Sequence, residues 1–318
     1  MRLGRGRRRP EPVQPASAAI AARRATLREP LEALYQEYGR CGAVEDPVEC
    51  VRVYADPADR EIAGFIAAGL AFGRVAGIVA SVRAVLAAMG ESPAAFVRRF
   101  DPAKDAAPLL PLVHRWVRGR DVAALLAILR HMLDEAGSLE AFFLAGDDPA
   151  EPDIRAGLES FCRRARAVDL QPVYGRIAAR PGAHAFFPLP SAGSACKRLN
   201  LFLRWMVRRD AVDLGVWTRV SPARLIIPLD VHVIRVGQCL RLTRYASPGW
   251  RMAASITASL RQIDPADPVK YDFALCHVGM QGLCGFRAPA GDSRCPLRGA
   301  CRPRARRRPA SRRPSCRR

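Results

Sequence analysis

Two residues of this chain have the types and spacing of a nucleophile and an assisting carboxylate: Lys197 and, 33 positions later, Asp230. The chain holds 51 lysine and arginine residues, of which only Lys104, Lys197 and Lys270 are lysine. Arginine stays protonated in proteins, whereas a lysine amine that has lost its proton can attack carbon. Two interpretations follow. Either the pair performs amine-based catalysis, or it is the commoner combination of a solvated lysine and a helix cap.

The composition permits a buried core and concentrates positive charge at the two ends. Hydrophobic residues make up 49% of the 318 residues, and the net charge is +21. Five arginines fall in residues 1–9 and nine in residues 302–318, so the remainder is only mildly basic. Segments rich in arginine and proline cannot bury apolar surface, and we expect disordered basic tails over residues 1–24 and 302–318. Such tails attract polyanions, including nucleic acid.

Several classes of protein are disfavoured by the sequence. It has no run of about 18 consecutive apolar residues, so a membrane span is not expected. No compact apolar segment follows the basic N-terminus, which argues against a signal peptide. We therefore expect a cytoplasmic protein, in which the ten cysteines would be thiols or metal ligands and not a disulfide framework.

Helical periodicity is frequent and strand signals are weak. Apolar residues spaced three and four apart predict an all-α protein with ten or more helices. The expected helices cover residues 27–38, 59–72, 78–89, 122–133, 138–144, 197–209, 231–240, 250–263 and 268–280, with further short helices between them. Residues 181–194 are rich in proline, glycine and serine and are expected to be irregular.

Two stretches of the sequence carry a family resemblance. They run over residues 193–200 and 228–236 and contain Lys197 and Asp230. A glycine-containing hairpin, a lysine, an amphipathic helix and the pattern Pro-x-Asp-x-His-x-x-Arg-Val together resemble the helix-hairpin-helix DNA glycosylase superfamily. That superfamily includes endonuclease III and the 8-oxoguanine glycosylases. The interval from lysine to aspartate is similar to that of the archaeal 8-oxoguanine branch.

A second resemblance covers most of residues 30–301. The sequence is similar to the bacterial family DUF2400, and the stretches that carry this similarity are residues 59–65, 71–74, 196–200, 228–230 and 267–275.

The glycosylase resemblance implies a fold and an activity. The fold would be two packed helical lobes over residues 25–301, and the protein would act as a monomer on double-stranded DNA in base excision repair. Lys197 would attack the sugar of a flipped damaged nucleotide while Asp230 takes up the proton or stabilises the charge on the sugar. The resulting Schiff base would also permit AP lyase activity.

Two residues near this pair are candidates for a supporting role. Arg198 would favour the uncharged form of the neighbouring amine, and His232 is a further candidate, although it is more typical of a helix-end histidine. In this superfamily the hairpin, here Gly193, Ser194 and Ala195, contacts the DNA backbone. Ala195 stands where the superfamily carries a second glycine, which leaves phosphate binding at this hairpin open.

The cysteines near the C-terminus suggest a metal site. Cys295 and Cys301 keep the last spacing of the iron–sulfur loop in endonuclease III relatives, but Asp292 occupies the position of the preceding cysteine. With Cys276 and Cys284 they would provide four ligands for an iron–sulfur cluster or, alternatively, zinc.

Other interpretations remain open at this stage. The chain could be a non-catalytic helical nucleic-acid-binding protein that keeps the fold, and its residues are compatible with RNA as well as DNA. We interpret Lys270 as an ion-pair partner, Cys162 and Cys239 as buried thiols, and Arg115 as a residue that pairs with an acid or faces DNA.

Overall fold

The computed structural model describes residues 18–39, 46–175, 179, 181–284, 294–298 and 300–301. In this part of the chain nearly all regular structure is helical, and the all-α prediction is confirmed. The helices are α1 (Ala18–Tyr38), α2 (Glu49–Arg52), α3 (Pro57–Gly69), α4 (Val75–Met89), α5 (Pro93–Arg99), α6 (Pro102–Asp105), α7 (Gly119–Ala136), α8 (Leu139–Leu144), α9 (Arg155–Arg166), α10 (Gln171–Tyr174), α11 (Lys197–Val207), α12 (Val231–Cys239), α13 (Trp250–Arg261) and α14 (Asp272–Met280). Three short 3-10 helices are η1 (Gly182–Phe186), η2 (Pro190–Ala192) and η3 (Pro222–Arg224). Strands β1 (Val113–His114) and β2 (Val117–Arg118) form one antiparallel hairpin.

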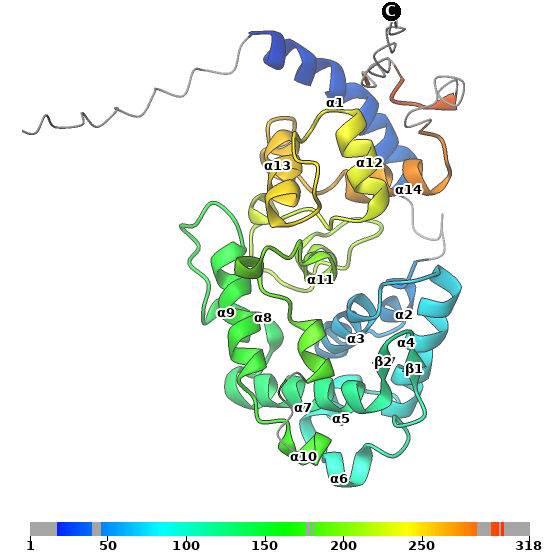
Figure 1. Ribbon diagram of the computed structural model, residues 1–318, viewed down its shortest axis with the longest axis vertical. Coiled ribbons are helices and arrows are strands. Elements are labelled where there is room, and N and C mark those ends of the chain that lie inside the picture. Colours follow the sequence, from blue (N-terminus) through cyan, green and yellow to red (C-terminus); the bar gives the residue numbers. More distant parts are fainter. Residues whose placement is uncertain are drawn as a thin grey trace, which may run out of the picture.

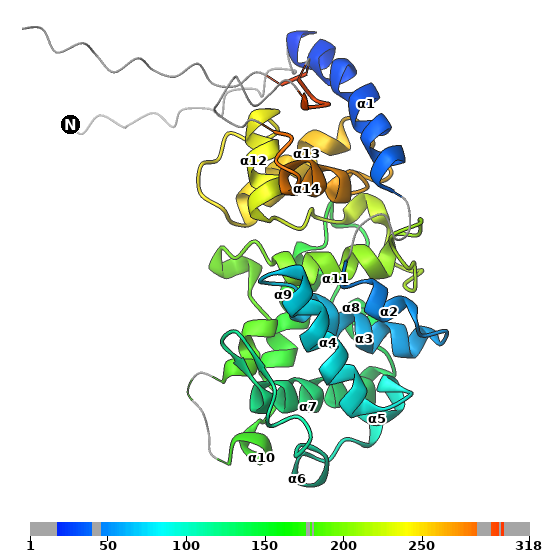
Figure 2. The same ribbon diagram turned by 90° about the vertical axis from the view of Figure 1, so that its right-hand side faces the viewer.

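The helices form two groups, with α11 at the junction between them (Figure 1). The upper group contains α12, α13, α14 and also α1, which packs against α14 although it is distant in sequence. The lower group contains α2 to α10 and the β hairpin. Helix α11 packs against α3 of the lower group. Figure 2, turned by 90°, shows the same order, with α1, α13 and α14 above α11 and α7 below it.

Short polar residues fix where several helices begin. The side chain of Asp56 accepts a hydrogen bond from the first turn of α3, and Ser92 and Ser138 do the same for α5 and α8. Such caps satisfy backbone amides that have no partner inside the helix. The helix start expected at residue 138 is confirmed, because Ser138 caps α8.

Two helices, α1 and α14, begin four or more residues away from their predicted starts. Helix α1 already begins at Ala18, inside the segment that we expected to be a disordered tail, since its alanine-rich first turns favour helix. Helix α14 begins at Asp272, because the carboxylate of Asp267 does not cap it and instead accepts two hydrogen bonds of 2.9 Å from Arg208. Residues 1–17 and 302–318 lie outside the described residues.

The core of the lower group is aromatic, and the carboxylate of Glu61 is buried in it. Glu61, on α3, accepts hydrogen bonds from the amides of Leu139 and Glu140 at the start of α8 and from Nε1 of Trp217. These three donors compensate a charge that would otherwise be costly to bury. Burial still raises the pKa of Glu61. Glu61 is therefore a structural residue that ties α3 to α8 and to the segment after α11.

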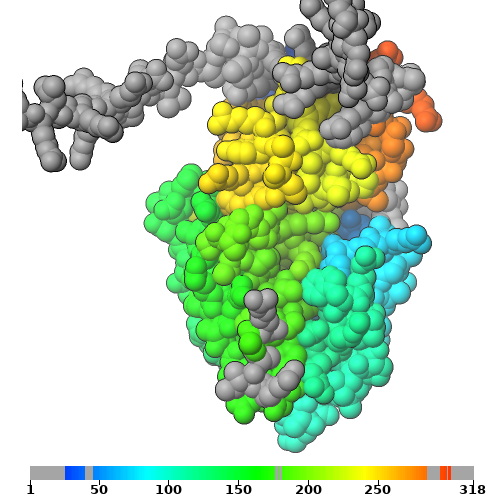
Figure 3. All heavy atoms as spheres, viewed as in Figure 1, coloured from blue at the N-terminus to red at the C-terminus, as the bar shows by residue number. Residues whose placement is uncertain are grey.

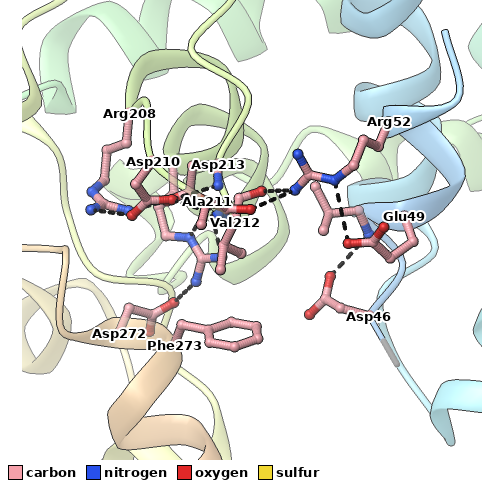
Figure 4. A network of polar contacts seen from close by, with 12 residues as sticks. Asp46, Glu49, Arg52, Arg208, Asp210, Ala211, Val212, Asp213, Asp272 and Phe273 are labelled. Atoms are coloured by element: carbon pink, nitrogen blue, oxygen red, sulfur yellow. Dashed lines mark hydrogen bonds and ion pairs between the residues drawn. The ribbon is translucent and has the colours of Figure 1, made fainter. Parts of the chain in front are cut away.

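A buried ion network holds α11 against α14 (Figure 4). Arg204 on α11 donates to Asp213 at 3.1 Å and also pairs with Asp272, the first residue of α14. One turn later, Arg208 pairs with Asp213 and donates to Asp210 at 2.9 Å. Both arginines are almost fully buried. Two guanidinium groups shared among several carboxylates fix the axial position of α11 relative to α14.

No single helix among the described residues is long and apolar enough to cross a membrane. Helices α4 and α5 reach the length and apolar composition of a membrane span only when they are taken together, across a bend of 60°.

Candidate active site

Lys197 is the first residue of α11 and is partly exposed. The residue before it, Cys196, adopts the left-handed conformation with φ of 48°, and its thiol donates to the carbonyl of Pro188 at 3.4 Å. Asn200 bonds the carbonyl of Ala195 from within the helix at 3.0 Å. The turn that precedes Lys197 is therefore held by side chains at both ends.

The predicted hairpin is a compact turn beside α13. Gly193 has φ of 81°, and its carbonyl accepts from the amide of Trp250 at 3.2 Å. Ala195 is not among the residues with positive φ, so the alanine is compatible with this backbone. No acceptor within the described residues is recorded for the amides of Ser194 and Ala195.

Asp230 is the N-cap of α12. Its Oδ1 accepts from the amides of His232 at 2.9 Å and Val233 at 2.7 Å. Its Oδ2 accepts from the thiol of Cys276 on α14 at 3.1 Å. The carboxylate is thus held by two different helices, and it is only partly exposed.

The thiol that bonds to Asp230, that of Cys276, has a strongly altered acidity. Burial raises the pKa of the Cys276 thiol, the negative charge of Asp230 raises it further, and the positive charge of Lys197 opposes both. The side-chain contacts of the described residues join Asp230 to Cys276 but join Lys197 to neither, so the pairing of the amine with the carboxylate stays a prediction.

The two supporting candidates point in different directions. Arg198 turns into the lower group, where it donates to the carbonyl of Gly69 at 2.6 Å and to that of Ala185. Burial lowers the pKa of Arg198 to about 10. His232 packs so closely on α14 that a Cβ at Gly279 would lie 2.6 Å from the Cβ of His232. Its Nδ1 is buried without a hydrogen-bond partner in the described part of the chain.

The metal site predicted for the cysteines stays a prediction, and two of them have hydrogen-bond partners of their own. The thiol of Cys276 donates to the carboxylate of Asp230, and the thiol of Cys301 donates to the carbonyl of Arg298 at 3.4 Å. The neighbouring thiol of Cys284 and burial raise the pKa of Cys239, and Cys301 adds to this effect. Cys239 is therefore a neighbour of these thiols and not simply a core residue. Among the described residues, no group of three or more histidine, cysteine or acidic side chains is close enough to hold a metal ion.

An arginine-lined groove adjoins the hairpin. It has a volume of about 720 Å³ and is formed by the start of α9 and the segment from the end of α12 into α13. The four arginines that line it are all exposed and make no ion pair within the described residues: Arg155, Arg241, Arg244 and Arg251. Trp250, whose amide bonds to Gly193, lines the same groove. On the face drawn in Figure 3, the yellow atoms of the upper segment lie directly against the green atoms below.

Two parts of this site were missed by sequence reasoning. Cys276 was assigned to a metal, although its position four residues after Asp272 placed it on the α14 face that meets α11. The arginine groove joins residues nearly a hundred positions apart, and only the cluster Arg241, Arg244 and Arg251 hinted at it.

A model of the family DUF2400, described as a protein of unknown function, matches residues 46–281. The chain belongs to the DUF2400 family. The DUF2400 match includes Lys197, Asp230 and Cys276 but ends before Cys284. No curated protein and no solved structure matches the chain.

Proposed function

We propose that this DUF2400 protein is a DNA glycosylase of the helix-hairpin-helix type, with Lys197 as the nucleophile and Asp230 as the assisting carboxylate. The observation that supports the proposal is the carboxylate of Asp230, held between α12 and α14, with Lys197 on α11, the helix that the pair between Arg204 and Asp272 joins to α14. A flipped nucleotide needs a site with an amine and a carboxylate within reach of one sugar. Double-stranded DNA bound by a monomer is the partner of this proposal.

The chemistry balances with these two residues. The uncharged amine of Lys197 bonds to C1′ of the deoxyribose, and the glycosidic bond breaks with its electron pair leaving on the base. Asp230 stabilises the positive charge on the sugar and receives the proton that the amine releases. Ring opening then gives a Schiff base, from which loss of the 3′ phosphate by β-elimination cleaves the strand. This second step is the AP lyase activity.

The surroundings of the pair suit a DNA substrate. The amides of Ser194 and Ala195 precede α11 and can donate to a backbone phosphate. The arginine groove adjoins the same turn through the bond between Trp250 and Gly193. Cationic side chains beside donor amides are the usual contacts of proteins with DNA phosphates.

Reductive trapping tests the proposal directly. Borohydride reduces a Schiff base to a stable amine, so incubation with a panel of damaged duplexes should give a covalent protein–DNA product. Since the chain has only three lysines, the assignment is simple. Lys197→Ala and Lys197→Arg should abolish the product, whereas Lys104→Arg should not, because Lys104 is an exposed residue on α6.

Two variants of Asp230 separate its proposed role in catalysis from its role as the cap of α12. Asp230→Asn keeps an oxygen that can cap α12, so the protein should stay folded while trapping falls at least a hundredfold. Asp230→Ala loses the cap as well and should lower the free energy of unfolding by about 1 kcal/mol. Trapping that is absent with every lesion, or equally strong in Lys197→Ala, would reject the enzyme.

A second candidate function rests on the hydrogen bonds of Asp230. Both of its oxygens are already engaged, with two amides and one thiol. A purely structural cap would have the same contacts in a non-catalytic protein that binds nucleic acid. That alternative predicts DNA binding with a steep salt dependence and no trapped product, and binding unaltered in Asp230→Asn.

A further inference from the structure

The β hairpin of the lower group presents an exposed tryptophan. Trp116 is 49% exposed, whereas the other three tryptophans, Trp205, Trp217 and Trp250, are at most 5% exposed. The adjacent turn residue, Arg115, has φ of 53°, a conformation that costs energy for residues other than glycine. Backbone strain at an exposed turn is often retained where the turn has a binding role.

Trp116 belongs to a fixed aromatic and cationic stack. Its ring lies parallel to that of Phe72, with ring centres 5.0 Å apart and an angle of 17°. The guanidinium of Arg198 lies 5.1 Å from the Phe72 ring centre and 5.6 Å from that of Trp116. Arg198 itself is anchored to the carbonyl of Gly69. Because Arg198 follows Lys197 directly, the stack is attached to the start of α11.

A cationic groove lies next to this stack. It has a volume of about 430 Å³, and its walls are the start of α4 and the hairpin. Arg74 and Arg115 line it without an acidic neighbour in the lining, and neither forms an ion pair within the described residues. His114 joins the two walls, since its ring nitrogens lie 2.9 Å from Oγ of Ser81 and 3.0 Å from the carbonyl of Phe72.

We propose that the hairpin and this groove bind an unpaired nucleotide of DNA, with the base stacked on Trp116 and the flanking phosphates held by Arg74 and Arg115. The inference rests on the proposed function for the identity of the nucleic acid. A stacking ring beside unpaired arginines is the arrangement that binds single-stranded DNA without sequence preference. A fully paired duplex has no free base for Trp116.

Tryptophan fluorescence of the full chain tests this site, because Trp116 is the exposed one of four. A single-stranded oligonucleotide and a duplex with an abasic site should both quench the emission that acrylamide can reach. An intact duplex should quench it much less. Trp116→Phe should remove the quenching while keeping affinity within about twofold, and Trp116→Ala should weaken single-strand binding about tenfold. Leu110→Ala, which truncates another exposed apolar side chain nearby in sequence, should leave affinity unchanged.

The outcomes separate this site from the proposed catalysis. Quenching measured in Lys197→Ala reports the nucleotide site alone, so it should persist even where trapping is lost. Equal affinity of Trp116→Ala and the unaltered chain would overturn the proposal, as would equal quenching by intact duplex. An RNA oligonucleotide of the same sequence that binds more tightly and quenches more strongly would overturn DNA as the occupant.

Discussion

The arginine groove beside the hairpin allows a quantitative test of DNA binding. The perturbation is the double variant Arg244→Ala and Arg251→Ala, which removes two of the four arginines that line the groove. Both side chains are exposed and make no ion pair within the described residues, so the fold should be unaffected. If both contact phosphates, their loss removes two of the counterions that DNA releases on binding.

The magnitude follows from polyelectrolyte theory. Each phosphate contact contributes about 0.9 to the slope of log affinity against log salt concentration, so the double variant should lower that slope by about 1.8. Over a fourfold rise in salt, this difference corresponds to a change of about tenfold in relative affinity. The deficit of the variant should therefore be largest at low salt and should shrink as salt is added.

Fluorescence anisotropy of a labelled duplex, titrated at several salt concentrations, measures both slopes. The matched control is Arg98→Ala with Arg99→Ala, which removes the same charge from α5, away from the groove. Because the arginine-rich tails are identical in all three proteins, their contribution cancels in the comparison. An unchanged slope in the groove variant, or an equal fall in the control, would show that binding depends on general charge and not on this groove.

Three further predictions concern stability and metal binding. Asp272→Asn leaves Arg204 with one carboxylate, that of Asp213, and should lower the free energy of unfolding in urea by about 3 kcal/mol. The surface variant Glu135→Gln should lower the free energy of unfolding by less than about 1 kcal/mol. Lys270 pairs with Glu32 at 2.9 Å and with Asp264 at 2.7 Å. Burial raises the pKa of each carboxyl group, but the interactions with Lys270 outweigh burial, so both pKa values are lowered. The stabilisation by these ion pairs is present above the pKa values of the unfolded chain, 4.5 for Glu32 and 3.8 for Asp264, and is lost as the pH falls below them. Lys270→Met should therefore lower the free energy of unfolding by about 1 kcal/mol at pH 7 and by much less at pH 3. If the iron–sulfur cluster or zinc predicted for Cys276, Cys284, Cys295 and Cys301 binds, metal analysis and near-UV absorbance should detect it and should lose it in Cys295→Ser, and absence of both signals in the unaltered chain would reject the metal site.

Local sequence signals predicted the elements well. The stripe of Leu199, Phe202, Leu203 and Met206 is buried on α11, as its spacing indicated. The ion pairs of Lys270 were also predicted. In these cases the determining interactions lie within a few residues or follow from one amphipathic face, so a linear pattern contains the information.

Long-range partners could not be predicted in the same way. Asp267 precedes a proline and has the pattern of a helix cap, yet its carboxylate binds Arg208, because a buried guanidinium gains more from a carboxylate than a surface helix end does. Likewise, Cys276 matches the composition of a metal loop, but its thiol bonds to Asp230. Each competing partner is distant in sequence, and its proximity is decided only by how α11, α12 and α14 pack.

That packing also determines where the proposed nucleophile and the proposed carboxylate lie. Lys197 and Arg204 are seven residues apart and therefore lie on the same face of α11, while Asp272 and Cys276 share a face of α14. The pair between Arg204 and Asp272 joins these two faces. Asp230 bonds to the thiol of Cys276 from the start of α12. The relative position of the candidate catalytic residues thus depends on a buried ion pair about two helical turns away, and loosening that pair should impair trapping by Lys197 even though neither partner contacts DNA.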